Sequence, residues 1–129
     1  MNINPCIYYE GGSKKYVLKE IYKGYIPFTP SKDIYTPYCR IDKSGWIQID
    51  AGYEWDGASG PTIDTPDTMD GSLVHDVLYQ LLREGVLGGN SRKFADKCIR
   101  EMCITDGMPK WRANYWYFFL RCFGGGSAR

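Results

Sequence analysis

The spacing of hydrophobic residues changes once along the chain, near residue 66. Before that point, short apolar runs alternate with polar residues, as in Trp46-Ile47-Gln48-Ile49-Asp50, and glycines and prolines separate the runs. Alternation of this kind is typical of half-buried strands joined by turns. The pattern predicts strands at residues 16–18, 21–26, 39–41 and 46–50, which would form a small antiparallel sheet.

After residue 66, apolar residues recur at every third or fourth position, which indicates amphipathic helices. A first helix is expected from about residue 67 or 72 to residue 84, with an N-cap at Asp67, Asp70 or Ser72 and a stop at Gly85. A second is expected at residues 91–105, with Gly107 ending it, and a third from Pro109, in its first turn, to Gly124. The predicted inward residues are Val74, Val77, Leu78, Leu81 and Leu82 in the first helix and Ala95, Cys98, Ile99 and Met102 in the second.

Together these elements predict an α+β fold, with an N-terminal antiparallel sheet followed by three helices. The short connection between the first two helices predicts an antiparallel pair. The length of 129 residues suits a single domain. Within it we expect a sheet half at residues 1–53, a turn segment and helical half at residues 54–124, and a flexible tail at residues 125–129.

Composition narrows the range of functions. With 16 Lys and Arg against 15 Asp and Glu, the net charge is +1, so nucleic-acid binding is not expected. No run of about 18 apolar residues predicts a transmembrane segment, and the start of the chain lacks a secretory-signal pattern. The five cysteines contain no CxxC pair and only one histidine accompanies them, so neither a zinc site nor a disulfide framework is expected. We expect a soluble protein made in a reducing cytoplasm.

His75 is the only histidine, so any imidazole acid or base must be this side chain. Helical spacing places it beside Tyr79 at the edge of the apolar stripe, and turns Asp76 about 100° away from it. One helical turn could therefore aim an imidazole and a carboxylate at adjoining parts of a cleft. The alternative is structural: His75 would be a partly buried residue bonded to Tyr79 or to backbone, and Asp76 a charge near the helix start.

Asp96 strengthens the case for a site, because an antiparallel helix pair could bring its carboxylate within reach of the His75 ring. A carboxylate that holds one imidazole nitrogen leaves the other nitrogen able to activate water. The alternative is an exposed residue of the run Ala95-Asp96-Lys97 that makes ordinary surface ion pairs.

The turn-rich segment before the first helix contributes Asp56, Gly57, Ser59 and Gly60. The glycines permit positive φ and a close approach of the backbone to a bound ion, and Asp56 could supply a hard oxygen ligand. The spacing matches neither a P-loop nor an EF-hand, and no G-x-S-x-G context marks Ser59 as a nucleophile. The alternative is a pair of tight turns between the sheet and the helices.

Three pieces of the sequence resemble a family common in tailed phages and prophages and catalogued as domain of unknown function 1353. They are Trp55-Asp56-Gly57-Ala58-Ser59-Gly60-Pro61-Thr62, then His75-Asp76-Val77-Leu78-Tyr79, then Asp96. The resemblance runs from about Tyr53 to Gly124 and leaves the sheet half uncovered. It implies a phage or prophage origin, synthesis in the host cytoplasm and, for a structural component, a place in the virion. It implies no particular activity.

A weaker similarity is to secreted phospholipase A2, whose catalytic helix carries His-Asp-x-Cys-Tyr and whose next long helix supplies an Asp to the histidine. It implies that His75 activates water, Asp96 orients His75, Tyr79 supports the pair, and Asp76 binds calcium, with Asp56 as a further calcium ligand. Calcium would polarise the carbonyl of a membrane lipid. The chain departs from that family at Leu78, which replaces a cysteine, and it lacks the flanking cysteines and a true glycine-rich calcium loop.

Two functions follow as hypotheses. The first is a small hydrolase, calcium-assisted or not, that acts on ester or amide substrates of the bacterial envelope. The second is a virion or assembly component of tail, baseplate or capsid that binds phage or host proteins without catalysis; sequence does not separate it from a host-directed effector. Aromatic residues of the third helix favour the second, because one helix cannot bury them all in a small domain. They are Trp111, Tyr115, Trp116, Tyr117, Phe118 and Phe119, with Cys122 beside them.

Overall fold

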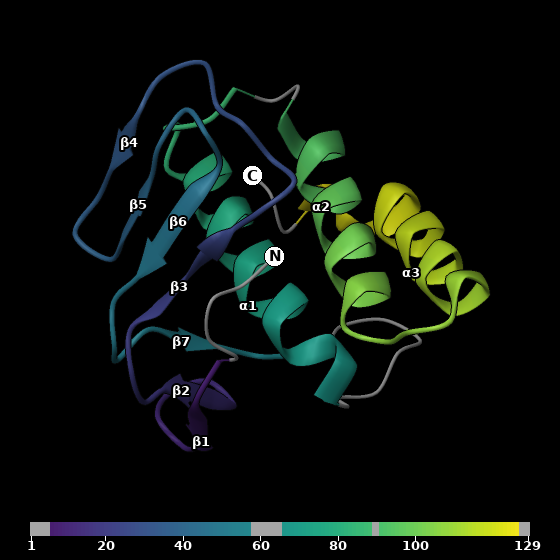
Figure 1. Cartoon of the computed structure of the whole chain (residues 1–129), viewed down its shortest axis with the longest axis horizontal. Coiled ribbons are helices and arrows are strands. Elements are labelled where there is room, and N and C mark those ends of the chain that lie inside the picture. The colour runs from purple at the N-terminus through teal and green to yellow at the C-terminus, as the bar shows by residue number, and fades with distance from the viewer. Residues whose placement is uncertain (1–5, 58–65, 89–90, 127–129) are drawn as a thin grey trace. The chain divides into compact units, whose positions relative to one another are not determined.

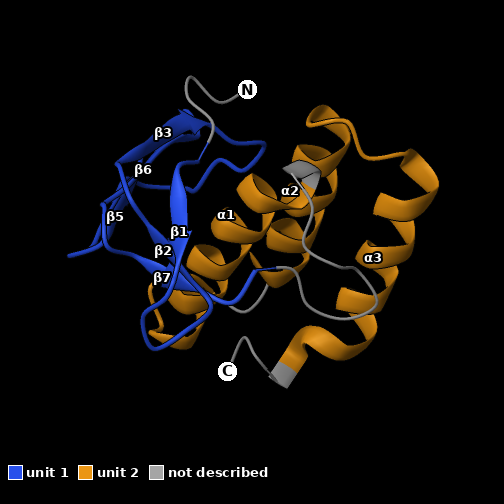
Figure 2. Cartoon of the chain, turned by 90° about the horizontal axis from the view of Figure 1, so that it is seen from below, with its two compact units in different colours: residues 1–57 blue, residues 58–129 orange. Residues whose placement is uncertain are grey.

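The computed structural model describes residues 6–57, 66–88 and 91–126, and its elements are labelled in Figure 1. The chain divides into two compact units, Met1–Gly57 and Ala58–Arg129 (Figure 2). The first unit contains strands and the second contains helices, so the predicted α+β class is confirmed. None of the described helices is long and apolar enough to cross a bilayer.

The first unit holds two antiparallel sheets rather than the one predicted. The strands are β1 (Tyr8–Glu10), β2 (Tyr16–Leu18), β3 (Tyr22–Tyr25), β4 (Ile34–Tyr35), β5 (Cys39–Ile41), β6 (Trp46–Ile49) and β7 (Glu54–Trp55). Consecutive strands β2 and β3 are separated only by residues 19–21, yet they belong to different sheets, in the orders β1-β2-β7 and β3-β6-β5-β4. Strands β4 and β7 were not predicted because two residues are too few to show alternation, and β1 was not predicted because all three of its residues are exposed, so it has no buried face to set a pattern.

The second unit consists of α1 (Pro66–Arg83), α2 (Ser91–Thr105), α3 (Lys110–Phe123) and the short 3-10 turn η1 (Gly124–Gly126). Since α1 begins at Pro66, the predicted N-caps Asp67, Asp70 and Ser72 are wrong and lie inside the helix. The Ser72 hydroxyl donates to the Met69 carbonyl at 3.0 Å, within the same helix. Of the two expected starts, residue 67 was right to within one residue, whereas residue 72 was wrong because the first turns bury polar side chains such as Thr68 and Asp70, which a hydrophobic pattern does not show.

Helices α1 and α2 both end at a glycine with positive φ, at the two glycines that the sequence predicted as stops. At the end of α1, Gly85 has a φ of 75°, and the Val86 N–H donates to the Leu81 carbonyl at 2.9 Å. Gly107, with a φ of 109°, ends α2 in the same way, and the Met108 N–H donates to the Cys103 carbonyl at 2.9 Å. This is the Schellman arrangement, in which a left-handed residue satisfies the last carbonyls and stops the helix.

Helices α1 and α2 pack as an antiparallel pair. Gly71 near the start of α1 lies beside Ile99 and Cys103 late in α2, whereas His75 lies beside Asp96 early in α2. A Cβ at Gly71 would lie 3.1 Å from the Cys103 sulfur, so the glycine permits a close approach of the two helices. The predicted inward residues of both helices are buried, except that Leu82 is only half-buried.

Helix α3 packs against α2 through one face. The shared apolar cluster is formed by Ile99, Cys103, Met108, Ala113, Trp116 and Leu120. The helix begins after Pro109, within one residue of the prediction, and its last residue precedes Gly124. After α3, residues 124–126 form the η1 turn, in which Gly124 is buried, and residues 127–129 of the expected flexible tail lie outside the described residues.

Candidate functional site

His75 and Asp76 lie in the middle of α1 and not near its start. Asp76 is therefore not a helix-start charge. His75 is buried, with 5% of its surface exposed, while the Asp76 side chain is 30% exposed. The imidazole thus sits in the interior of the helical unit, next to a carboxylate that reaches solvent.

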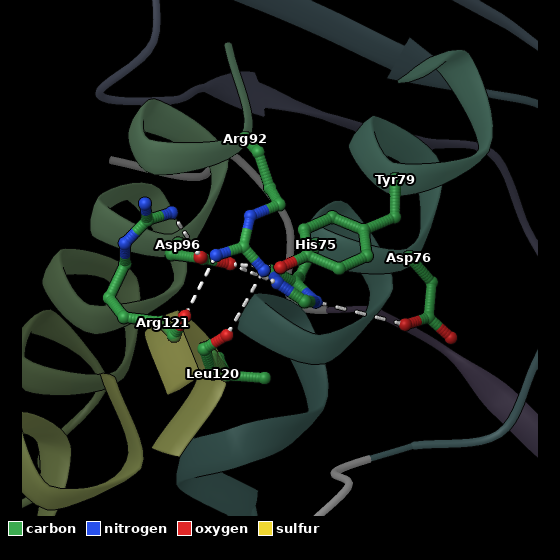
Figure 3. A network of polar contacts seen from close by, with 7 residues as sticks. All are labelled: His75, Asp76, Tyr79, Arg92, Asp96, Leu120 and Arg121. Carbon is green, nitrogen blue, oxygen red and sulfur yellow. Dashed lines mark hydrogen bonds and ion pairs between the residues drawn. The ribbon is translucent and has the colours of Figure 1, made fainter. Parts of the chain in front are cut away.

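The first turns of α2 bring Asp96 to the His75 ring. The distance from Nε2 of His75 to Oδ1 of Asp96 is 2.9 Å, and Asp96 has no exposed surface (Figure 3). The alternative of an exposed Asp96 that forms ordinary surface ion pairs is wrong. A buried carboxylate needs partners, because an uncompensated charge in the protein interior is strongly unfavourable.

Two further donors complete the shell of Asp96. The Tyr79 hydroxyl donates to Oδ1 at 2.5 Å, and Nη1 of Arg121 donates to Oδ2 at 3.0 Å. The His75 and Tyr79 rings also contact each other, with their centroids 4.0 Å apart and their planes tilted by 41°. Arg121 comes from the last turn of α3 and was missed by sequence reasoning, since only the packing of α3 on α2 brings it near Asp96.

These contacts fix the protonation of the cluster. Burial alone would raise the pKa of the Asp96 carboxyl, but hydrogen bonds from His75, Tyr79 and Arg121 outweigh it and hold the pKa below its ordinary value. Burial and the hydrogen bond to Asp96 raise the pKa of the Tyr79 phenol above its ordinary value, so Tyr79 remains a donor. Asp96 is therefore an anion that accepts from three groups.

The same contacts fix the tautomer of a neutral His75. An ionised carboxylate can only accept, so the nitrogen that bonds to it must carry the hydrogen. A neutral imidazole has one N–H, so Nε2 is the donor and Nδ1 carries the lone pair. Asp76 lies on the other side of the ring from Asp96, and its Oδ1 is 4.0 Å from Nδ1, beyond hydrogen-bonding distance (Figure 3).

The C-terminal end of α3 is held over the cluster by two more contacts. Arg92 of α2 donates to the carbonyls of Leu120 at 3.4 Å and Arg121 at 2.8 Å, which satisfies two groups at a helix C-terminus. Gly124 follows directly, and a Cβ placed there would lie 2.6 Å from the Tyr79 hydroxyl oxygen. A side chain at position 124 would therefore collide with the group that bonds to Asp96.

The turn segment is only partly described. Asp56 is exposed after β7, and Gly57 has a φ of 82°, which bears out the expected use of a glycine there. Ser59 and Gly60 lie outside the described residues. Asp56 and Gly57 belong to the first unit, and the role of Asp56 as a calcium ligand stays a prediction.

The described residues alone form no complete metal site. Within residues 6–57, 66–88 and 91–126, no group of three or more His, Cys, Asp or Glu side chains is placed to hold a metal ion. Asp76 offers one half-buried carboxylate beside the imidazole. Its role as a calcium ligand stays a prediction.

Comparison with known proteins places the chain in a family without fixing an activity. The model of the family described as "protein of unknown function (DUF1353)" matches residues 33–119. The chain belongs to this family. Neither the curated proteins nor the solved structures give a significant match. The match begins earlier than the expected Tyr53 and so includes part of the sheet unit; it contains His75 and Asp96 but ends before Arg121.

Proposed function

We propose that this DUF1353 protein is a hydrolase in which His75 is the general base and Asp96 orients it. The supporting observation is the 2.9 Å bond from His75 Nε2 to the fully buried Asp96, which leaves the lone pair of Nδ1 on the Asp76 side of the ring. A carboxylate that fixes the tautomer and stabilises the imidazolium is the arrangement that lets histidine take a proton from water.

The proposed reaction is the hydrolysis of an ester by one water molecule. Nδ1 of His75 accepts a proton as the water oxygen bonds to the carbonyl carbon, and Asp96 stabilises the imidazolium that forms. When the bond between the acyl carbon and the leaving oxygen breaks, the imidazolium returns the proton to that oxygen. The products are a carboxylic acid and an alcohol, and the histidine is again neutral.

The charge of Asp76 affects whether the proposed reaction needs a cation. A tetrahedral intermediate carries an oxyanion, and a carboxylate 4.0 Å from the imidazole would repel it. A cation held by Asp76 would remove that repulsion and polarise the carbonyl. Calcium is therefore a variable to test, in line with the similarity to phospholipase A2.

We propose esters of the bacterial envelope, membrane phospholipids first, as the substrate class. The support is the order of groups along α1 and α2: His75, Asp76 and Tyr79 on one helix and Asp96 on the next correspond to the groups that the similarity to phospholipase A2 implies. An ester is tested before an amide because an alkoxide is the better leaving group. A phage origin, synthesis in the host cytoplasm and activity at the host envelope belong to the same proposal.

The test is hydrolysis of 4-nitrophenyl esters and of phosphatidylglycerol vesicles, each with added calcium and with a chelator. His75→Asn should lower kcat/KM by about 100-fold or more, the contribution expected of a general base. Glu84→Gln, which changes an exposed carboxylate just after α1, is the matched control and should leave the rate unchanged. The proposal fails if folded wild-type protein hydrolyses none of these esters, or if His75→Asn retains the wild-type rate.

A second candidate function is a binding role in a phage particle, at the tail, baseplate or capsid. The observation that favours it is the exposure of Trp111, Tyr115 and Phe118 on α3. Isolated large apolar side chains are common on surfaces, but a contiguous group often marks a binding site. Presence of the protein in purified particles at a fixed copy number would support this role, and its absence from them would rule it out.

A further inference from the structure

Helix α3 has two opposite apolar faces, and only one of them is buried. Ala113, Trp116 and Leu120 form the buried face. Trp111 is 73% exposed, Tyr115 58% and Phe118 67%. These three residues, which we call the aromatic stripe, are spaced four and three positions apart, so they lie on one side of the helix. At about 100° per residue the centre of the stripe is roughly opposite the buried face.

The charge on α3 has one sign. The segment from Lys110 to Phe123 contains Lys110, Arg112 and Arg121 and no Asp or Glu, although the chain as a whole carries a net charge of only +1. Arg121 pairs with Asp96, so the outward charge of the helix comes from Lys110 and Arg112. By the helical repeat these two residues flank the stripe on opposite sides. The surface is therefore aromatic in the middle and cationic at its margins.

We propose that the aromatic stripe of α3 binds an anionic lipid surface, with α3 lying in the plane of the interface. Trp and Tyr rings favour the boundary between headgroups and acyl chains, because they combine an apolar body with a polar tip. Helices that lie in this boundary carry Lys or Arg beside an apolar face, and the cations attract anionic headgroups. Both features are present on α3.

A second copy of the chain fits this surface less well. Two stripes packed face to face would bring Lys110 and Arg112 of each copy near the same cations of the other, with no carboxylate of α3 to oppose them. One helix face of this length also presents less than the roughly 800 Å² per partner of a standard stable interface. An anionic surface supplies both the apolar contact and the missing negative charge.

Lipid binding through α3 does not depend on catalysis, although the two proposals fit together. The helix that carries the stripe also supplies Arg121, which bonds to the carboxylate that holds His75. A protein that binds the lipid surface through α3 would hold the unit of three helices, and with it the His75–Asp96 pair, at that surface. The inference stands even if His75 proves to be structural.

The experiment measures binding of the full chain to vesicles of phosphatidylcholine alone and of phosphatidylcholine with phosphatidylglycerol, by flotation. Wild-type protein should bind the anionic vesicles about tenfold or more tightly than the neutral ones, and high salt should weaken the binding. The double variant Trp111→Ser with Phe118→Ser should lose about tenfold or more of the affinity. The matched control is Phe94→Ser, which removes a 54% exposed aromatic ring on α2, outside the stripe, and should bind as wild type.

A second variant locates the contact independently of affinity. Trp111→Phe keeps an aromatic ring, so it should still bind, but it should lose the blue shift of tryptophan fluorescence that vesicles cause in the wild type. The proposal is overturned if the double variant Trp111→Ser with Phe118→Ser binds as tightly as wild type, or if wild-type protein does not bind anionic vesicles. The stripe would instead bind a protein if the chain forms a concentration-dependent dimer, or attaches to phage particles, only when the stripe is intact, and does not bind vesicles. That result would also overturn the proposal.

Discussion

Replacing Asp96 with asparagine tests the electrostatic centre of the helical unit. Asp96 is fully buried and accepts hydrogen bonds from His75, Tyr79 and Arg121. Asparagine keeps one acceptor oxygen, but its amide hydrogens face groups that are themselves donors. Breaking a buried ion pair costs about 3–5 kcal/mol. The Arg121 side chain is 32% exposed and can turn toward water, so a loss of about 3 kcal/mol is expected, near the lower limit.

The loss should depend on pH in a defined direction. Because the folded-state pKa of Asp96 lies below its ordinary value of 3.8, the ionised group stabilises the fold at every pH above the unfolded pKa. That contribution is lost as the pH falls through the folded pKa, when wild-type Asp96 also becomes neutral. The difference between wild type and Asp96→Asn should therefore be constant near neutral pH and shrink below about pH 4.

Urea unfolding followed by circular dichroism, at about pH 7 and about pH 3, measures both effects. The matched control is Glu101→Gln on the same helix, where the half-exposed carboxylate pairs with Nη2 of Arg100 at 2.8 Å. An exposed pair of this kind contributes about 0–1 kcal/mol, so the control should stay close to wild type. A loss of less than about 1 kcal/mol for Asp96→Asn at neutral pH, or a loss that does not shrink on acidification, would refute the reasoning.

Two further predictions concern the contacts around Asp96. Tyr79→Phe removes one hydrogen bond to a charged acceptor and should lower the free energy of unfolding by about 1.5–3 kcal/mol in the same urea assay. A smaller loss would mean that His75 or Arg121 moves to bond at the vacant position, and nuclear magnetic resonance of the single histidine would reveal such a move. Gly124→Ala places a methyl group 2.6 Å from the Tyr79 hydroxyl and should lower the melting temperature clearly more than Gly125→Ala, where the nearest atom is 3.5 Å away; equal effects would contradict the collision.

The helical unit was predictable because its signals are local. The periodicity of residues 91–105 and the glycines at positions 85 and 107 act within one or two helical turns, and the observed ends of α2 match the predicted ones. The sheet unit was less predictable, because a short strand can pair with a strand that lies far away in the sequence. Strand β2 pairs with β7 about forty positions away, and two residues of β7 carry no pattern of their own.

The candidate site was predictable only in part, for the same reason. His75, Tyr79 and Asp96 follow from helical spacing and a short antiparallel connection, which together fix which faces meet. Arg121 could not be predicted, because its contact with Asp96 depends on where α3 crosses the other helices. The steric role of Gly124 could not be predicted either, because a glycine after a helix indicates a helix end and says nothing of the side chains packed against it.

The dependence of Asp96 on three helices means that loss of activity in a variant says little unless stability is measured beside it. His75→Asn removes one of the three hydrogen bonds to Asp96 and leaves those from Tyr79 and Arg121 in place, so it should cost about 1.5–3 kcal/mol of stability, as Tyr79→Phe does, and, if His75 is a base, nearly all activity. Tyr79→Phe keeps the imidazole and its bond to Asp96, so it should cost comparable or greater stability and far less activity. If His75 and Asp96 are catalytic, the loss of activity relative to the loss of stability should be far larger for His75→Asn than for Tyr79→Phe. If the network is purely structural, this ratio should be the same for both variants.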